Sequence, residues 1–349
     1  MNQLKLTKAS RRNFMTYGFV IVAYVILQSL ASGGHMSSML KGQLVPICAY
    51  VVMAISLNLT VGVLGELSLG HAGFMSVGAF LGTTTAVAMQ NSVASPTLRL
   101  VCALVVGAVF AGVVGFLVGI PVLRLNGDYL AIVTLAFGEI IKAIFNNLYL
   151  GFDENGFHLS LLDNKLDMAP EGKLIIGGPM GIGGIQKIAS FTVGFALIII
   201  CLIVIFNLVN SRAGRAIMAI RDNRIAAESV GIPVTKYKMM AFVTSAAMAG
   251  AAGALFALNY STIVANKFDF NMSILVLVFV VLGGLGNMFG SIVAAAALTI
   301  LPEALRQFAN YRMLVYAIVL ILVMLVRNNP TIKMFFERFR FGKKGGAEE

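Results

Sequence analysis

Residues 191–210 read "FTVGFALIIICLIVIFNLVN" and contain no charged side chain. A helix of this length rises about 30 Å, the thickness of the hydrocarbon core of a bilayer. The rest of the 349-residue chain has the same character, with 58% hydrophobic residues, 12% charged residues and a mean hydropathy of +0.89. Soluble domains carry about a quarter charged residues. The sequence therefore predicts an all-α, polytopic membrane protein.

Further apolar runs lie on both sides of this one. Their bounds are about 14–31, 44–64, 67–90, 98–122, 128–150, 239–259, 272–303 and 311–327. Many of the 36 glycines fall inside these runs, which is typical of membrane helices that pack closely through small residues. The first run follows a basic start, as in a secretory signal, but it is longer than a usual signal core. We expect it to remain in place as the first helix.

The run 272–303 is too long for one simple span, and its middle is rich in glycine. Residues 281–291, "VLGGLGNMFGS", favour a break in the helix. We expect this run to cross twice or to re-enter, which brings the total to about ten transmembrane or re-entrant helices. Residues 63–79, "VLGELSLGHAGFMSVGA", resemble 281–297, "VLGGLGNMFGSIVAAAA", so the chain contains either an internal repeat or a chance similarity of two glycine-rich segments.

The charges predict which parts face inside, because basic residues collect in cytoplasmic loops. Residues 1–13, 211–238 and 328–349 are basic, so both termini and the segment 211–238 are expected in the cytoplasm, around a membrane domain at 14–327. The connection 151–190 carries more acidic than basic residues and is expected outside. This distribution accounts for the net charge of +11 without a nucleic-acid partner. The cysteines Cys48, Cys102 and Cys201 lie within apolar runs and are interpreted as packing residues.

Four segments resemble a known family and occur in the order typical of it. They are "LNLTVGVLGELSLGHAGFMSVGAF" (57–80), "GDYLAIVTLAFGEIIK" (127–142), "GGPMGIGGI" (177–185) and "SRAGRAIMAIRDNRIAAESVGI" (211–232). They resemble the permease subunits of branched-chain amino acid ABC importers of the Liv type, and the likeness extends over about residues 40–328.

This resemblance implies a multi-pass protein of the bacterial inner membrane that works within a complex. The expected partners are two cytoplasmic ATPase subunits, a second related permease, a periplasmic amino-acid-binding protein and the membrane lipid. The phosphate-binding pattern G-x-x-x-x-G-K-[ST] is absent from this chain. We therefore expect no enzyme activity and no cofactor here, with ATP and Mg²⁺ bound by the partner subunits.

For the segment 211–238, the resemblance implies a coupling helix that docks on the ATPases. Its composition predicts a helix of about 15 residues, ended by Gly231 and Pro233, with an Arg224–Glu228 pair on one face. The family motif E-A-A with a later glycine is shifted here, because Glu228 follows Ala226 and Ala227. The candidate docking residues are Arg215, Arg221, Arg224, Ala226, Ala227, Glu228 and Gly231. The alternative is an ordinary basic loop.

Polar residues at membrane depth are costly and usually mark a path or a pairing. The candidates for a substrate path are Asn58, Glu66, Ser68, His71, Thr134 and Glu139. Structural alternatives exist for several: Glu66 at a cytoplasmic turn, His71 bonded to a backbone carbonyl, and Glu139 paired with Lys142 three residues later. Asp128 is expected to cap the helix that follows it.

Other functions remain open. The substrate could be another small polar solute such as urea or a short amide. The chain could also be an ion-coupled secondary carrier, with Glu66, His71 or Glu139 as the coupling group, or a membrane scaffold without transport activity. The connection 151–190 forms either part of a platform for the binding protein or a short outer helix with turns.

Overall fold

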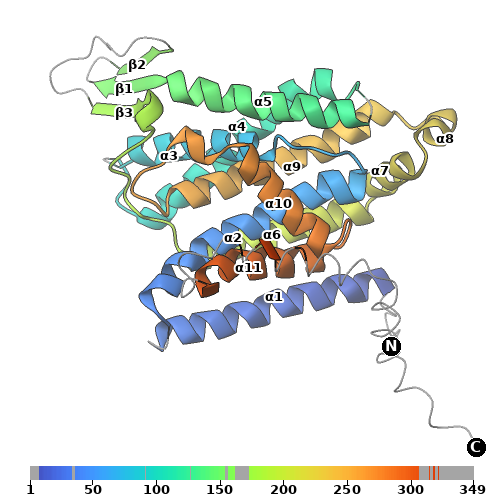
Figure 1. The fold of residues 1–349 in the computed structure, drawn as a ribbon, viewed down its shortest axis with the longest axis horizontal. Coiled ribbons are helices and arrows are strands. Elements are labelled where there is room, and N and C mark those ends of the chain that lie inside the picture. The colour runs from blue at the N-terminus through green and yellow to red at the C-terminus, as the bar shows by residue number, and fades with distance from the viewer. Residues whose placement is uncertain are drawn as a thin grey trace, which may run out of the picture. The chain divides into compact units, whose positions relative to one another are not determined.

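The computed structural model describes residues 8–33, 36–90, 92–125, 127–153, 156–161 and 173–305, with four further positions between 314 and 321. The chain forms two compact units, Met1–Ala296 and Ala297–Glu349, and the sites below lie in the first. The helices of Figure 1 are α1 (Lys8–Ser32), α2 (Ser38–Asn58), α3 (His71–Ala88), α4 (Pro96–Val122), α5 (Asp128–Asn147), α6 (Phe191–Asn210), α7 (Arg212–Asp222), α8 (Arg224–Ser229), α9 (Val234–Ala257), α10 (Phe270–Gly283) and α11 (Met288–Ala304).

Within the described residues, seven helical stretches are long and apolar enough to cross a membrane. They are Phe14–Ser32, Leu40–Leu64, Pro96–Val122, Tyr129–Asn147, Phe191–Asn210, Val234–Ala257 and Ala265–Gly283. The predicted helical, polytopic membrane protein is thereby confirmed. The total of about ten segments and the cytoplasmic termini stay predictions, because the run 311–327, the residues 1–7 and the tail 328–349 lie almost wholly outside the described residues.

The core forms where α9 packs against α2, α3 and α4. The spans that contain α2 and α9 are the most deeply buried of the seven. Glycines allow this packing, because a Cβ atom on Gly78 of α3 would overlap the backbone of Gly250 on α9, and one on Gly250 would overlap Gly107 of α4. Close helix packing through small residues, as the sequence predicts, therefore holds the centre of the bundle together.

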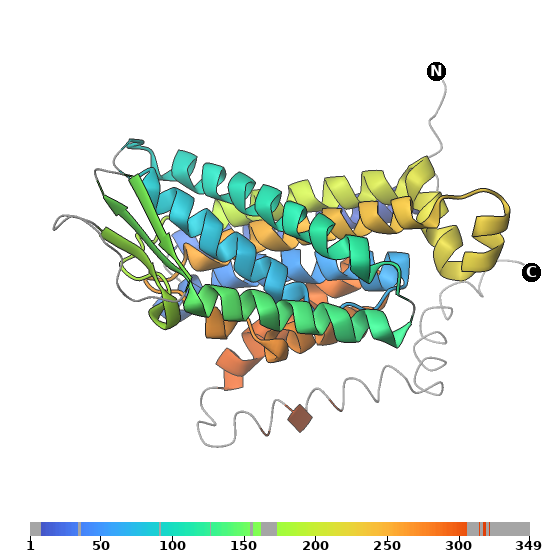
Figure 2. The same cartoon turned by 90° about the horizontal axis from the view of Figure 1, so that it is seen from above.

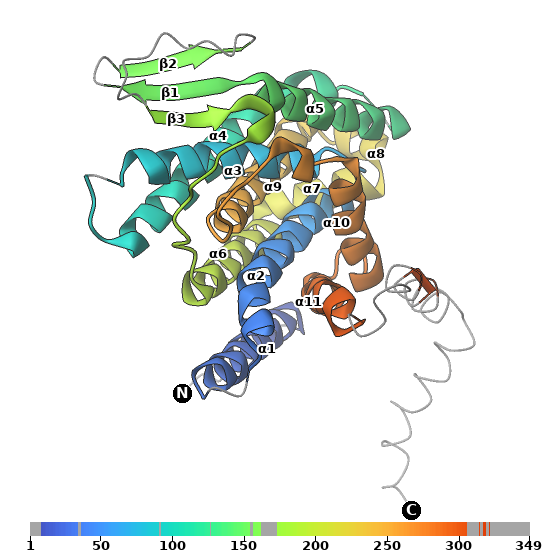
Figure 3. The same cartoon turned by 60° about the vertical axis from the view of Figure 1, so that its left-hand side comes forward.

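A small antiparallel sheet, which the sequence did not predict, lies in the connection after α5. It consists of β1 (Tyr149–Asp153), β2 (Gly156–Ser160) and β3 (Lys173–Gly177) in the order β2-β1-β3 (Figure 3). Within the described part of this connection the helical element is a single 3-10 turn, Gly178–Met180, so the alternative of a short outer helix is wrong for those residues. The sheet and the pair α7–α8 lie at opposite ends of the bundle (Figure 2).

Two helices of the bundle are interrupted. α2 continues as a π-helix, Leu59–Leu64, and residues 65–70 then form neither helix nor strand before α3 begins at His71. α10 ends at Gly283, and α11 begins at Met288 after a turn. The predicted break within 272–303 is thus confirmed. The two copies of the internal similarity, 63–79 and 281–297, have the same design of helix, break and helix.

Candidate functional site

The two helix breaks meet at Asn58, which is fully buried at the end of α2. Its side-chain oxygen accepts a hydrogen bond from Gly286 N at 2.8 Å, and its Nδ2 donates to Ser291 Oγ at 2.8 Å. The contact is close, because a Cβ atom on Gly62 would overlap the backbone of Gly286. Asn58 therefore connects the two interrupted helices by hydrogen bonds, a structural role that polar residues within membrane spans often have.

His71 begins α3 and is buried between α2 and α9. Its Nε2 lies 3.2 Å from Ser56 Oγ and 3.0 Å from Ser245 Oγ. Both hydroxyl hydrogens are used elsewhere, since Ser56 donates to Met53 O and Ser245 donates to Ser56 O. With the hydroxyls donating in this way, the contacts fit the His71 tautomer that carries its hydrogen on Nε2, in which Nδ1 is an acceptor. These partners are hydroxyls and not the backbone carbonyl of the structural alternative.

Two buried polar atoms beside this group lack a partner among the residues that the structure describes. They are His71 Nδ1 and Ser68 Oγ, and both side chains are 1% exposed. Nearly all buried polar atoms in proteins form hydrogen bonds, so an exception indicates a water molecule or a ligand. These two atoms are therefore the candidate polar groups at the start of α3.

The stretch before α3 also contacts α5. Leu69 N donates to Thr134 Oγ1 at 3.1 Å, and Thr134 is buried. Five residues further along α5, Glu139 forms the predicted ion pair with Lys142 and borders a small void beside Ser273. The structure thus brings Asn58, Ser68, His71 and Thr134 to the two breaks, whereas Glu139 is satisfied by its own helix. α5 begins at Asp128 itself and is preceded by Gly127 as its N-cap, so the predicted cap at Asp128 is wrong.

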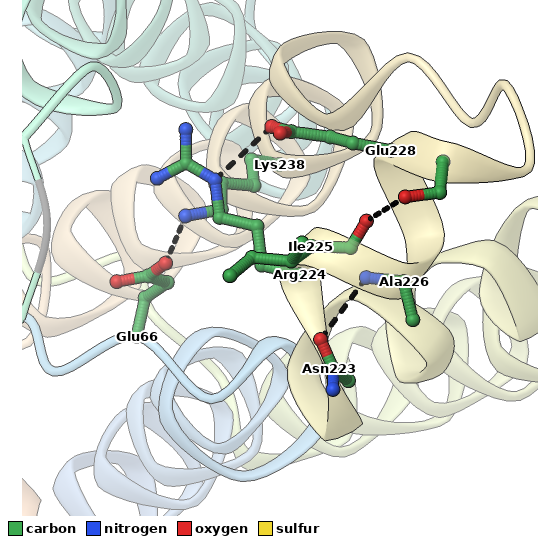
Figure 4. Close-up of polar contacts among 8 residues, drawn as sticks. Glu66, Asn223, Arg224, Ile225, Ala226, Glu228 and Lys238 are labelled. Atoms are coloured by element: carbon green, nitrogen blue, oxygen red, sulfur yellow. Dashed lines mark hydrogen bonds and ion pairs between the residues drawn. The ribbon is translucent and has the colours of Figure 1, made fainter.

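Glu66 lies in the break and forms an ion pair with Lys238 of α9 (Figure 4). The Lys238 side chain is 3% exposed and that of Glu66 15% exposed. Lys238 belongs to the basic segment 211–238, but its side chain is buried and points toward Glu66 and not toward solvent. Of the first 127 residues Glu66 is the only acidic one, which is the signal that could have identified this pair.

The basic segment forms two helices and not the single predicted one. The chain is extended at Asn223, whose Oδ1 accepts a hydrogen bond from Ala226 N at 3.0 Å and so caps α8 (Figure 4). The other local predictions are confirmed. Arg224 pairs with Glu228 at 3.2 Å, and Gly231 ends the helix with φ of 81° before α9 starts at Val234.

We call residues 212–231, which comprise α7, α8 and the turn after them, the docking segment. Its surface includes Arg215, Ala226, Glu228 and Gly231, which are exposed, and Arg221 and Arg224, whose side chains are 39% exposed. Ala227 instead faces inward, in a cluster with Ile220 and Val234. Sequence reasoning missed Ile225 and Val230, whose side chains are 77% and 76% exposed. These two exposed apolar side chains are therefore added to the candidate docking residues.

A cleft of about 720 Å³ lies between the docking segment and the break. It is lined by Leu64, Gly65, Glu66, Gly127, residues 220–225, Glu228 and Lys238. Arg221 crosses toward the break, where its Nη1 donates to Gly62 O at 3.1 Å. Of the candidate path residues, Glu66 lines this cleft, together with the candidate docking residues Arg221, Arg224 and Glu228.

Comparison with known proteins places this arrangement in a family. Residues 39–324 match the family described as "Branched-chain amino acid transport system / permease component". The chain is 35% identical to the high-affinity branched-chain amino acid transport system permease protein LivM of Salmonella typhimurium, over 82% of this chain and 68% of that protein. It is 34% identical to LivM of Escherichia coli, over 86% of this chain and 71% of that protein.

A more distant relative is the probable LivM permease of Methanocaldococcus jannaschii, which is 27% identical over 69% of this chain and 74% of that protein. No solved structure matches the chain. The match to the family covers the two breaks, the docking segment and the sheet alike. The chain belongs to the permease-component family of branched-chain amino acid transport systems.

Proposed function

We propose that this chain is the permease subunit of an ATP-driven importer that carries leucine, isoleucine and valine across a bacterial inner membrane. The observation that carries the proposal is the similarity to two LivM permeases over more than four-fifths of the chain. The many apolar helices agree with this role. The chain transports and does not catalyse a reaction, and its complex supplies the energy.

The substrate path runs along the two breaks, beside Asn58, Ser68, His71 and Thr134. The ammonium group of an amino acid needs an acceptor, and His71 Nδ1 and Ser68 Oγ are buried there without a partner among the described residues. The aliphatic side chain of the substrate needs an apolar wall, which α2, α3 and α9 provide. Interrupted helices occur at membrane depth where they line a cavity.

The docking segment binds an ATPase subunit on the cytoplasmic side, and the two ATPase subunits of the complex bind ATP and Mg²⁺. The exposed side chains of Ile225 and Val230 enter an apolar groove of the partner, and Arg224 of α8 and Arg215 of α7 select acidic groups. At the other end, the sheet forms part of the platform for a periplasmic binding protein. A second, related permease completes the membrane part.

The test of docking is co-elution of the purified chain with its ATPase subunits. Ile225→Asp places a charge in the apolar contact and is expected to weaken binding at least about 30-fold, because a desolvated anchor at an interface contributes at least about 2 kcal/mol. Ile225→Leu keeps the apolar surface and serves as the matched control. Equal co-elution of both variants would contradict docking through α8.

Transport by the reconstituted complex tests the substrate and the energy source together. Uptake of radiolabelled leucine should require ATP, all partner subunits and the binding protein. Uptake of urea or acetamide in place of leucine would identify a different solute. Leucine uptake by the chain alone, abolished by a protonophore, would instead indicate an ion-coupled carrier in which His71 or Glu66 takes up the proton.

A further inference from the structure

Two contacts join this region to the break after α2, one from the docking segment and one from the start of α9 after it. We call residues 59–70, the π-helix and the irregular stretch after it, the break segment. At the end of α7, Arg221 donates to Gly62 O within the π-helix. Four residues after α9 begins, Lys238 pairs with Glu66. We propose that Glu66 and Lys238 are positioning residues that transmit movement of the docking segment to the break segment during transport.

The break segment is the part of this region that such a contact could move. Residues 65–70 have no regular secondary structure, and their start is bonded locally, through Glu66 N to Thr60 O. An irregular stretch of backbone moves together with a neighbouring helix only where side-chain contacts connect the two. On the side of the docking segment these attachments are the Glu66–Lys238 pair and the Arg221–Gly62 hydrogen bond.

Movement of the break segment would reach the polar groups of the path. It is preceded by Asn58, which holds Gly286 and Ser291 of the other break. It is followed by His71, which contacts Ser56 and Ser245. Asn58 thus lies four residues before Gly62, which Arg221 holds, and His71 lies five residues after Glu66, which Lys238 holds.

The placement of the ion pair favours this role over a surface contact. Exposed ion pairs are weak and easily exchanged for water. The Lys238 side chain is instead only 3% exposed, so separating it from Glu66 would leave a buried charge without its partner. The pair therefore resists separation, and a displacement of one partner displaces the other.

This inference rests on the proposed function, and its test uses the complete complex in liposomes, with uptake measured per ATP hydrolysed. The primary variant is Glu66→Gln with Lys238→Met, which removes both charges and leaves neither buried alone. We expect retained co-elution with the ATPases and retained hydrolysis, with uptake per ATP reduced about tenfold, within the usual range of coupling between sites. The charge exchange Glu66→Lys with Lys238→Glu should restore a large part of the uptake per ATP hydrolysed.

Unchanged uptake per ATP in the folded double variant would overturn the inference and leave the proposed function intact. Failure of the native chain to assemble with ATPases would overturn the proposed function instead. If the double variant does not fold, cysteines at 66 and 238 are joined by a flexible thiol cross-linker, in a chain with Cys48, Cys102 and Cys201 replaced. Transport should survive this link because the two positions move together, and its loss would contradict the inference.

Discussion

Gly65 has a left-handed backbone, with φ of 82°, where the π-helix ends. Its α-carbon faces Arg221, so a Cβ atom there would lie 3.3 Å from Arg221 Cδ and closer still to Cγ. Gly65→Ala should lower the free energy of unfolding by about 1–2 kcal/mol through the backbone alone, and further through this crowding. Thermal unfolding of the purified chain in detergent measures the loss.

Gly231→Ala is the matched control for this prediction. Gly231 has nearly the same φ, 81°, but no atom of its surroundings lies within 4 Å of the position that a Cβ atom would take. Its substitution should therefore carry the backbone cost without the crowding. Equal losses in the two variants would mean that the Arg221 side chain yields freely and does not hold the break.

Asn58 offers a second prediction for a single residue. Asn58→Ala leaves Gly286 N without its acceptor and removes one of two hydrogen bonds of Ser291 Oγ, and an unsatisfied buried group costs about 1–3 kcal/mol. Asn210→Ala is the control, because Asn210 is exposed and bonds to Phe206 O of its own helix. Its effect should stay within about 0.5 kcal/mol. Comparable thermal stability of the two variants would show that the breaks do not depend on Asn58.

Individual residues differ in how far the sequence predicts their contacts. The pairs Arg224–Glu228 and Glu139–Lys142 follow from helical spacing, and both are present. The pair Glu66–Lys238 joins residues 172 positions apart, so no local pattern reports it. The hydroxyls of Ser56 and Ser245 around His71 were missed for the same reason. Local spacing determines the first kind of contact, whereas the meeting of distant helices depends on packing.

At the scale of the helices, the contact of α9 with α4 depends on glycine. A Cβ atom on Gly250 would overlap the carbonyl of Gly107 and the side chain of Ala111. Gly250→Ala should force these helices apart at a cost of about 1–3 kcal/mol, seen as a lower yield of monodisperse protein in detergent.

Gly112→Ala is the control on the facing helix. Its Cβ atom would lie 3.4 Å from that of Ala247, an ordinary contact, so the yield should match that of the native chain. A normal yield for Gly250→Ala would mean that α4 and α9 have room to adjust.

The length of the apolar runs was enough to predict the helices. The breaks within the helices were predicted only in part. The break after Gly283 follows from a cluster of glycines, which lack a side chain to stabilise a helix. Residues 67–70 of the other break were assigned in the sequence to a span at 67–90, because Leu67, Leu69 and their neighbours are apolar. The extended backbone at Asn223 was also missed, since an Asn that caps a new helix has no distinct composition.

For the whole molecule, composition was sufficient to predict a polytopic membrane protein, because about 20 apolar residues in a row have few other uses. The sheet at 149–177 was not predictable in this way. Its three strands are five residues each and lie within a polar connection full of turn residues. Short strands gain their stability from pairing, which the sequence of one strand does not reveal.

The orientation of the molecule in the membrane gives the last prediction. The end of the bundle with the docking segment exposes Arg124, Arg212, Arg215 and Lys236, so it should face the cytoplasm. The test uses a chain in which Cys48, Cys102 and Cys201 are replaced. A single new cysteine is then introduced at an exposed position, either by Lys236→Cys near the docking segment or by Gly183→Cys at the sheet end. A membrane-impermeant maleimide should label the Gly183→Cys chain when added from outside and should label Lys236→Cys only after permeabilisation. The opposite pattern would place the docking segment outside, where cytoplasmic ATPases have no access, and would overturn the proposed function together with the orientation.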